Sequence, residues 1–183
     1  MTARIIILNG AGSVGKSSIA KALQSMTAEP FLHVQMDAFV FMLPENSFDR
    51  PEGLTFETMI EDGKPSVRIT SGPVADRTFR GMRRAIAAMA GQGNNLIVDE
   101  VMLENEWTDY AILLADFDVS LIGVVAPLDV LESRELDRED RLAGLARWQY
   151  DRVHRGLRYD FEVDTSRATP MECATLIKQA FGL

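Results

Sequence analysis

The chain has 183 residues, of which 46% are hydrophobic and 25% are charged, and its formal net charge is -8. This composition is ordinary for a globular protein and excludes an intrinsically disordered chain. The acidic balance argues against a nucleic-acid binder, because such proteins need an excess of lysine and arginine to neutralise phosphates. The length suits one core, so we expect residues 1–183 to form a single domain.

The single cysteine, Cys173, cannot form an internal disulfide, which fits a reducing compartment and predicts a cytoplasmic protein. Cys173 lies in a helical pattern, where we expect a small buried side chain. The first apolar run, residues 5–8, is far too short for a signal-peptide core or a membrane span. We therefore expect no membrane association.

The first part of the chain predicts a strand, a glycine-rich loop and a helix. Residues 4–9 form a short isoleucine-rich run, which is typical of a parallel strand buried on both faces. Apolar residues then recur at helical spacing over 16–26. A second strand is predicted over 31–36, directly before Asp37.

Residues 45–72 carry several prolines, glycines and acidic residues without sustained periodicity. The composition predicts a long functional or mobile loop there, with a short strand over 67–70 inside it. Further along, the pattern predicts a helix over 74–92 and a third strand over 95–98, which ends at Asp99 and Glu100.

The last part of the chain continues the alternation of helices and strands. Helices are expected over 104–115, from Pro127 onward and over 142–154, and strands over 117–125 and 159–163. Thr169, Pro170 and Glu172 then have the spacing of a capping box, which predicts a final helix to about residue 181. The alternation predicts an α/β protein with the three-layer P-loop NTPase fold: a five-stranded parallel sheet with helices on both faces.

The glycine-rich loop matches the pattern G-x-x-x-x-G-K-[S/T] at Gly10, Gly15, Lys16 and Ser17. Glycine allows the backbone to turn several N–H groups toward a phosphate, and the following helix adds its N-terminal dipole. Lys16 is expected to reach the β- and γ-phosphates, and the Ser17 hydroxyl is expected to ligate Mg²⁺. The sequence lacks the Asn-Lys-x-Asp guanine signature, which favours ATP. The predicted nucleotide contacts in the loop are Gly10, Ala11, Gly12, Ser13, Val14, Gly15, Lys16, Ser17 and Ser18.

Carboxylates follow the second and third predicted strands, where ligands of such sheets bind. Asp37 is a candidate for the general base that takes the proton of an acceptor hydroxyl, or for a helix N-cap, or for both. Asp99 is the candidate that orients Mg²⁺ together with Ser17. Glu100 either faces the acceptor or belongs to a solvated strand end.

Arginines cluster at Arg134, Arg138 and Arg141. On one continuing helix all three would share a face, and we interpret 134–145 as a lid whose arginines compensate charge on the transferred phosphoryl group. The alternative is a salt-bridged surface, because acidic residues are interleaved with them. A second group, mostly expected on a solvated face but with one member in reach of the acceptor, comprises Arg77, Arg80, Arg83 and Arg84.

These motifs together resemble the chloramphenicol phosphotransferases, a family of P-loop small-molecule kinases. The resemblance runs nearly end to end and rests on Ile-Ile-Leu-Asn-Gly (6–10), Gly-Lys-Ser (15–17), Asp37, Ile-Val-Asp (97–99), Arg-Glu-x-x-Arg-x-Asp-Arg (134–141), Val-His (153–154) and Tyr-Asp-x-Glu-Val-Asp-Thr (159–165). It implies ATP-dependent phosphorylation of a hydroxyl group with Asp37 as general base. It also implies that Arg134 stacks on adenine, that Arg138 and Arg141 contact phosphates, and that the loop after residues 163–165 lies near the adenine.

Residues 45–72 and 102–110 differ from the family pattern, and we expect them to line the acceptor pocket. The acceptor is accordingly a small molecule with a hydroxyl group: chloramphenicol or a related antibiotic, or another metabolite such as a nucleoside or a sugar. A non-enzymatic ATP-gated regulator is the remaining alternative, and the oligomeric state stays open. His33 is expected in a structural role, and His154 either in a structural hydrogen bond or in a ligand contact.

Overall fold

A five-stranded parallel sheet forms the centre of the molecule. The computed structural model describes residues 2–137 and 142–183. The sheet contains β1 (Arg4–Asn9), β2 (Phe31–Gln35), β5 (Asn95–Glu100), β6 (Asp118–Val125) and β7 (Phe161–Asp164), in the order β2-β5-β1-β6-β7. All four neighbouring pairs are parallel. The predicted α/β fold with a five-stranded parallel sheet is therefore confirmed.

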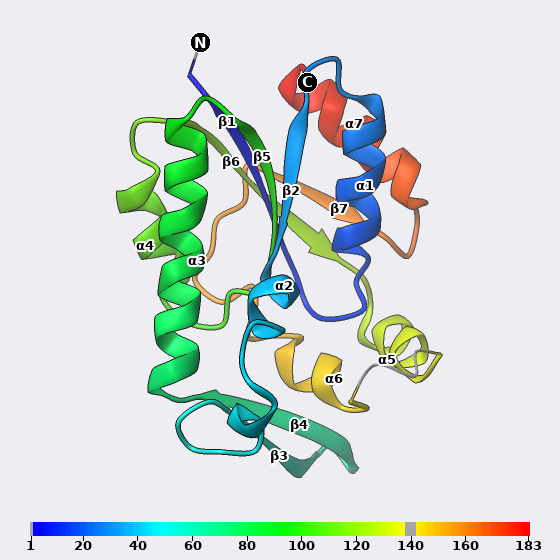
Figure 1. Cartoon of the computed structure of the whole chain (residues 1–183). Helices are drawn as coiled ribbons and strands as arrows, with labels where there is room; N and C mark the ends of the chain where they lie inside the picture. The colour runs from blue at the N-terminus through cyan, green and yellow to red at the C-terminus, as the bar shows by residue number, and fades with distance from the viewer. Residues whose placement is uncertain (1, 138–141) are drawn as a thin grey trace.

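Helices cover both faces of this sheet (Figure 1). One face carries α1 (Lys16–Met26) and α7 (Pro170–Phe181), and the other carries α3 (Pro73–Gly91) and α4 (Glu106–Leu113). Side chains of β1 alternate between the two cores, because successive residues of a strand point to opposite faces. Ile6 packs in the first core and Ile5 in the second.

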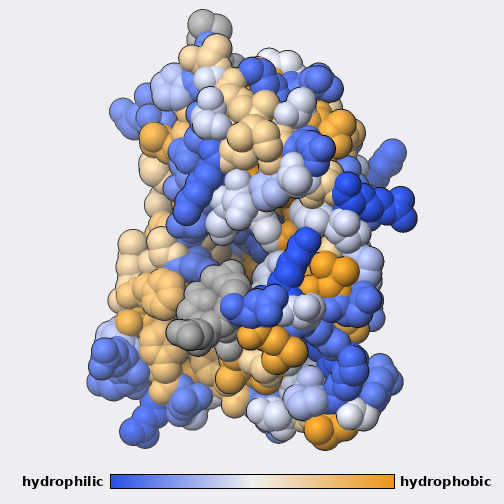
Figure 2. Space-filling view, turned by 90° about the vertical axis from the view of Figure 1, so that its right-hand side faces the viewer, coloured by the Kyte–Doolittle hydropathy of each residue, from blue (hydrophilic) through white to orange (hydrophobic). Residues whose placement is uncertain are grey.

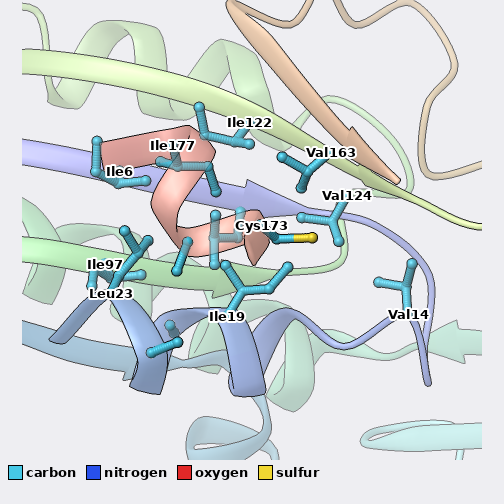
Figure 3. Packing of buried hydrophobic residues seen from close by; sticks show 14 of the residues in the cluster. Ile6, Val14, Ile19, Leu23, Ile97, Ile122, Val124, Val163, Cys173 and Ile177 are labelled. Atoms are coloured by element: carbon cyan, nitrogen blue, oxygen red, sulfur yellow. The ribbon is translucent and has the colours of Figure 1, made fainter. Parts of the chain in front are cut away.

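The first core is built from the apolar side chains of β1, α1 and α7 (Figure 3). Ile19 and Leu23 of α1 face Ile177 of α7 there, and each of the three is fully buried. Cys173 lies in the same core with no exposed surface, as its helical pattern predicts. The predicted capping box at the start of α7 is also confirmed: Thr169 accepts from the Glu172 N–H, and the Glu172 carboxylate accepts from the Thr169 N–H.

The prediction of a loop over residues 45–72 is wrong for most of this segment. Residues 54–71 form an antiparallel hairpin of β3 (Leu54–Glu61) and β4 (Lys64–Ser71), preceded by a 3₁₀ turn, η1 (Glu45–Ser47). The hairpin turn is Asp62-Gly63, and both residues have positive φ angles, 51° and 75°. An aspartate–glycine pair is a strong hairpin signal, because both central residues of the tight turn need positive φ. Figure 1 shows the hairpin at the end of the molecule opposite the termini.

Several shorter elements also differ from their predictions. Asp37 follows β2 inside a short helix, α2 (Met36–Val40), and the N-cap position of this helix is Gln35, so the N-cap interpretation of Asp37 is wrong. The helix predicted over 142–154 is reduced to α6 (Leu145–Gln149), followed by turns. Arg134 lies on α5 (Leu128–Leu136), which ends at Leu136, before the next arginine of the cluster.

Within residues 2–137 and 142–183, every helix is too short or too polar to cross a membrane. The face to which α1, α5 and α7 contribute carries hydrophilic side chains interspersed with apolar ones, and it is hollowed near its middle (Figure 2).

Candidate active site

The phosphate loop joins the end of β1 to the start of α1. Gly10 is required by packing, because a Cβ there would lie 2.3 Å from the Val124 carbonyl oxygen of β6. Gly15 precedes the helix at φ 99°, a torsion that favours glycine. Lys16 is 7% exposed, and its Nζ donates to the Gly10 and Ala11 carbonyls at 2.8 and 3.0 Å. The loop therefore wraps around its own lysine.

A cavity of about 460 Å³ opens over the loop and the start of α1. Asp37, Asp99 and Arg134 line it from three different elements, and Thr165 closes it from the segment after β7. Of the predicted loop contacts, those that line the cavity are Ser13, Val14, Gly15, Lys16, Ser17 and Ser18. Gly10, Ala11 and Gly12 are not among its lining residues in the described part of the chain.

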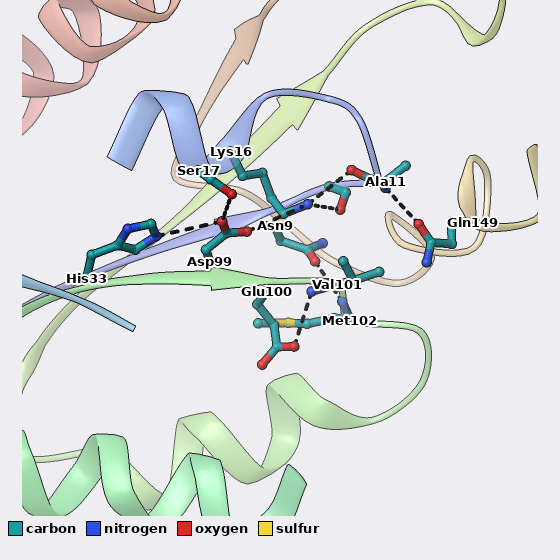
Figure 4. A network of polar contacts seen from close by, with 12 residues as sticks. Asn9, Ala11, Lys16, Ser17, His33, Asp99, Glu100, Val101, Met102 and Gln149 are labelled. Carbon is teal, nitrogen blue, oxygen red and sulfur yellow. Dashed lines mark hydrogen bonds and ion pairs between the residues drawn. The ribbon is translucent and has the colours of Figure 1, made fainter. Parts of the chain in front are cut away.

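Asp99 is the centre of a buried polar network at the end of β5 (Figure 4). The Ser17 hydroxyl donates to its Oδ2 at 2.5 Å, and Lys16 Nζ lies 3.8 Å from its Oδ1. His33 Nε2 lies 3.7 Å from Oδ2, which places the histidine that we expected to be structural beside this carboxylate. Burial opposes the charged form of Asp99, but His33, Lys16 and Ser17 outweigh it and lower its pKa.

The pair formed by Ser17 and Asp99 has the chemistry that Mg²⁺ requires. Both offer hard oxygen atoms, and Mg²⁺ in phosphoryl-transfer sites takes one or two protein oxygens and completes its shell with substrate phosphates and water. Among the described residues, no three histidine, cysteine, aspartate or glutamate side chains are grouped to hold a metal ion on their own. The two residues therefore fit a magnesium ion that arrives with a nucleotide.

Arg134 connects α5 to the segment after β7. Its two terminal nitrogens donate to the Thr165 hydroxyl at 2.9 Å and to the Thr165 carbonyl at 2.8 Å. Thr165 in turn donates to the Val14 carbonyl of the phosphate loop at 2.8 Å. Arg134 therefore lies between the nucleotide cavity and the segment after β7. Arg138 and Arg141, predicted in the same lid, lie outside the described residues.

A second cavity, of about 950 Å³, lies between α3, the hairpin and α6. Asp37 lines both this cavity and the first one. The second cavity is also lined by residues of the two segments that differ from the family pattern: Leu54, Phe56, Arg68, Ile69, Thr70, Ser71, Leu103, Glu104, Asn105, Glu106 and Asp109. Because we expect these segments to line the acceptor pocket, we refer to this cavity as the acceptor cavity.

The arginines of α3 divide between the surface and this cavity. Arg77 and Arg84 are exposed and do not line it among the described residues, whereas Arg80 and Arg83 do. Arg83 is 8% exposed; its Nε donates to the Asp109 Oδ2 at 3.0 Å, and its Nη2 forms an ion pair with the same oxygen at 2.9 Å. Most of the group, Arg77, Arg80 and Arg84, is thus exposed as expected, and Arg83 is the buried exception.

Glu100 is 2% exposed and lines the acceptor cavity, so its interpretation as part of a solvated strand end is wrong. Its carboxylate accepts from the Tyr110 hydroxyl at 2.6 Å and from the Val101 N–H at 3.1 Å. Burial raises the pKa of Glu100 to about 7, although both hydrogen bonds work in the opposite direction. The carboxyl group therefore titrates close to neutral pH.

The titration of Glu100 predicts a stability that depends on pH. Because the folded chain retains a proton between pH 4.5 and about 7 that an unfolded glutamate has released, the free energy of unfolding falls as the pH rises through this window. The loss is expected to reach roughly 3 kcal/mol. Glu100→Gln keeps one oxygen for Val101 and one polar atom for Tyr110, so it is expected to flatten this dependence.

Urea denaturation of both proteins between pH 5 and pH 8, at about half-unit steps, measures the difference. Glu57→Gln is the matched control, because Glu57 is exposed on the hairpin. The same slope in Glu100→Gln as in the unsubstituted protein would contradict the assignment to Glu100.

Two residues beside the site were not predicted as site residues, although Asn9 lies in the 6–10 motif of the family resemblance. Asn9 is fully buried at the end of β1; its amide donates to the Val153 carbonyl and the Tyr159 hydroxyl, and its carbonyl accepts from the Met102 N–H. Gln149 accepts from the Gly12 N–H at 2.7 Å. Both connect segments far apart in the chain. His154 makes a structural hydrogen bond, one of the two roles expected for it, between its Nδ1 and the Tyr159 hydroxyl at 2.6 Å, and burial lowers the pKa of its imidazole.

A parallel sheet with a glycine-rich loop after its central strand, a buried lysine in that loop and a second cavity beside it defines a kinase of the P-loop class. The model of the family "Chloramphenicol phosphotransferase-like protein" matches residues 3–182. The chain belongs to this family, and it is a small-molecule kinase.

Comparisons with individual proteins agree with this assignment. The chain is 36% identical over 174 residues to a protein of Mycobacterium tuberculosis (strain ATCC 25618 / H37Rv) that carries the name "Putative O-phosphotransferase Rv2636"; the match covers 92% of this chain and 77% of the relative. The crystal structure of a sugar kinase from Janibacter sp. HTCC2649 superimposes with a TM-score of 0.70 at 20% identity, covering 98% and 95% of the two chains. The Mycobacterium tuberculosis APS kinase CysC, in complex with AMPPNP and APS, superimposes with a TM-score of 0.69 at 14% identity, covering 100% and 99%. These two structures share the fold.

Proposed function

We propose that this chain transfers the γ-phosphoryl group of ATP, with Mg²⁺, to a hydroxyl group of a small molecule. The observation that carries the proposal is the position of Asp37, which lines both the nucleotide cavity and the acceptor cavity. A carboxylate at this boundary is placed to take a proton from a hydroxyl group on one side as a phosphoryl group arrives from the other.

The donor side holds the nucleotide through the phosphate loop. The N–H groups of residues 13–18 surround the phosphates, and Lys16 neutralises the β- and γ-phosphate charge. Ser17 and Asp99 hold Mg²⁺, which when bound neutralises charge that develops on the phosphate oxygens. Arg134, placed against Thr165 at the end of the same cavity, contacts the adenine.

The acceptor side supplies the attacking hydroxyl and its base. Asp37 accepts the hydroxyl proton, and the acceptor rests against the hairpin and α3. We further propose that Arg138 and Arg141 compensate charge on the phosphoryl group when the lid, residues 134–145, closes over both cavities and excludes water. Residues 1–183 form a single kinase domain in this proposal, and the location in the cytoplasm stays a prediction from composition.

The first acceptor to test is chloramphenicol, because the family is described by that activity. A metabolite with both a hydroxyl and an anionic group is the second candidate. It is favoured by three exposed arginines that line the acceptor cavity, Arg68, Arg80 and Arg155. Guanidinium groups bind carboxylates and phosphates through paired hydrogen bonds.

ADP release tests both candidates. The protein is mixed with Mg²⁺ and either ATP or GTP, and then with chloramphenicol, gluconate, shikimate or a nucleoside in turn. The proposal predicts that ADP is released from ATP only when an acceptor is present, and that mass spectrometry detects the phosphorylated acceptor. Release of GDP from GTP is expected to be slower. Binding of ATP without any acceptor-dependent ADP release would support the non-enzymatic regulator and overturn the proposal.

A further inference from the structure

The last residue of α6, Gln149, extends from the acceptor cavity to the phosphate loop. Its side-chain oxygen Oε1 accepts a hydrogen bond from the Gly12 N–H at 2.7 Å, and the residue is 3% exposed. A Cβ on residue 12 would lie 3.3 Å from the same oxygen, so glycine permits this close approach. Figure 4 shows Gln149 directly beside the start of the loop, on the side away from Asp99.

The hydrogen bond to Gly12 determines which way the amide group of Gln149 points. A backbone N–H can only donate, so the atom that faces it must be the carbonyl oxygen, and Nε2 with its two N–H groups lies on the other side. Gln149 lines the acceptor cavity but not the nucleotide cavity. Within residues 2–137 and 142–183, no side chain or carbonyl accepts a hydrogen bond from this Nε2. The donor group is therefore available to a ligand in the acceptor cavity.

Two other elements hold α6, and with it Gln149, in place. The Glu135 carboxylate, 3% exposed on α5, accepts from the Gly144 N–H at 2.7 Å and from the Ala146 N–H at 2.8 Å at the start of α6. The Gly144 carbonyl accepts from the Val67 N–H of β4 at 2.9 Å. Because α5 also carries Arg134, the position of Gln149 depends on both the nucleotide side and the hairpin side of the molecule.

We propose that Gln149 is a catalytic residue that orients the attacking oxygen for transfer. Its Nε2 donates a hydrogen bond to the acceptor hydroxyl oxygen or, without an acceptor, to the water that takes its place. This inference rests on the proposed function. A glutamine that orients the nucleophile is an established device in phosphoryl transfer. Oε1, held by Gly12, sets the distance between that oxygen and the phosphate loop.

In the proposed phosphoryl transfer, every bond that forms is matched by one that breaks. The oriented oxygen forms a bond to the γ-phosphorus while the bond between that phosphorus and the β,γ-bridging oxygen breaks. The bridging oxygen keeps the electron pair and leaves with ADP, and the proton of the attacking hydroxyl group passes to Asp37. Gln149 exchanges no proton and only fixes the direction of approach, so its loss is expected to slow turnover without preventing nucleotide binding.

ATP hydrolysis in the absence of acceptor tests this inference without knowledge of the acceptor. Gln149→Glu keeps an oxygen for the Gly12 N–H but replaces the Nε2 donor with a second oxygen, whereas Gln149→Ala removes both groups. We expect ADP release at saturating Mg²⁺–ATP to fall at least about tenfold in both variants. Affinity for a non-hydrolysable ATP analogue should change by much less than the rate. The melting temperature should fall in Gln149→Ala only.

Gln92→Glu is the matched control, because Gln92 is exposed at the end of α3 and carries the same charge change. Equal rates of ADP release in Gln149→Glu and the unsubstituted protein would overturn the role of Gln149 and leave the proposed function in place. Loss of analogue binding in Gln149→Glu as large as the loss of rate would also overturn it, since the residue would then only shape the loop. An unsubstituted protein that binds the analogue but releases no ADP with or without acceptors would overturn the proposed function as well.

Discussion

Replacing Asp37 with asparagine is expected to lower turnover by roughly 10²- to 10⁴-fold. Asparagine has nearly the same shape as aspartate but cannot accept the proton that the attacking hydroxyl must lose. Asp37 lies on α2, outside the phosphate loop, so the contacts that the loop makes with ATP do not depend on its charge. The KM for ATP is therefore expected to stay within about threefold, and the loss to appear in kcat.

The measurement is acceptor-dependent ADP release, with thermal unfolding as a check on folding. Asp116→Asn is the matched control, because Asp116 is exposed in the segment before β6, at the opposite edge of the sheet from the phosphate loop. Full turnover in Asp37→Asn would exclude Asp37 as the base. A rise in the KM for ATP equal to the loss of kcat/KM would assign it to nucleotide binding instead.

Replacing Asp99 with asparagine is expected to raise the Mg²⁺ concentration needed for half-maximal activity by roughly 10- to 100-fold. The amide oxygen still accepts from the Ser17 hydroxyl, but the negative charge that attracts the metal is lost. Because the pKa of Asp99 is lowered, this carboxylate is charged throughout the neutral range, and the effect is expected to be independent of pH there. Binding of the ATP analogue without Mg²⁺ should persist, since Lys16 loses a competing partner.

A magnesium titration of ADP release at fixed ATP measures this effect. Asp118→Asn serves as the control, because Asp118 is an exposed partner of Arg4 at the start of β6. An unchanged magnesium requirement in Asp99→Asn would show that Asp99 does not act on the metal. Its buried charge would then serve to hold Lys16 and Ser17 in place.

Most of the elements that hold the donor side could be predicted, because their signals are local. The isoleucine run of β1, the glycine pattern of the loop and the helical spacing of α1 are adjacent in the chain. The capping box at Thr169 needs only four residues, and it is present as predicted. The prediction fails for segments whose structure depends on packing against another element. One example is α6, whose first N–H groups donate to the carboxylate of Glu135 on α5.

The hairpin depends both on a local sequence signal and on packing against a distant part of the chain. Its Asp62-Gly63 turn was present in the sequence as a local signal, but its strands carry many polar residues and lack a clean alternation. Those strands form because residues such as Ser66 and Val67 are buried against α6, which is distant in the chain. Propensity alone could not reveal that contact.

The identity of the nucleotide-binding loop and of the paired candidates Asp37 and Asp99 followed from the sequence alone, because a strand, a glycine loop and a strand-end carboxylate are each specified by neighbouring residues. Only the tertiary structure brought Asp37 to the boundary of two cavities, buried Glu100 beneath Tyr110 and carried Gln149 to Gly12. The physical reason is that burial, and hydrogen bonds such as the one between Gln149 and Gly12 across 137 positions, leave no periodic trace in the chain.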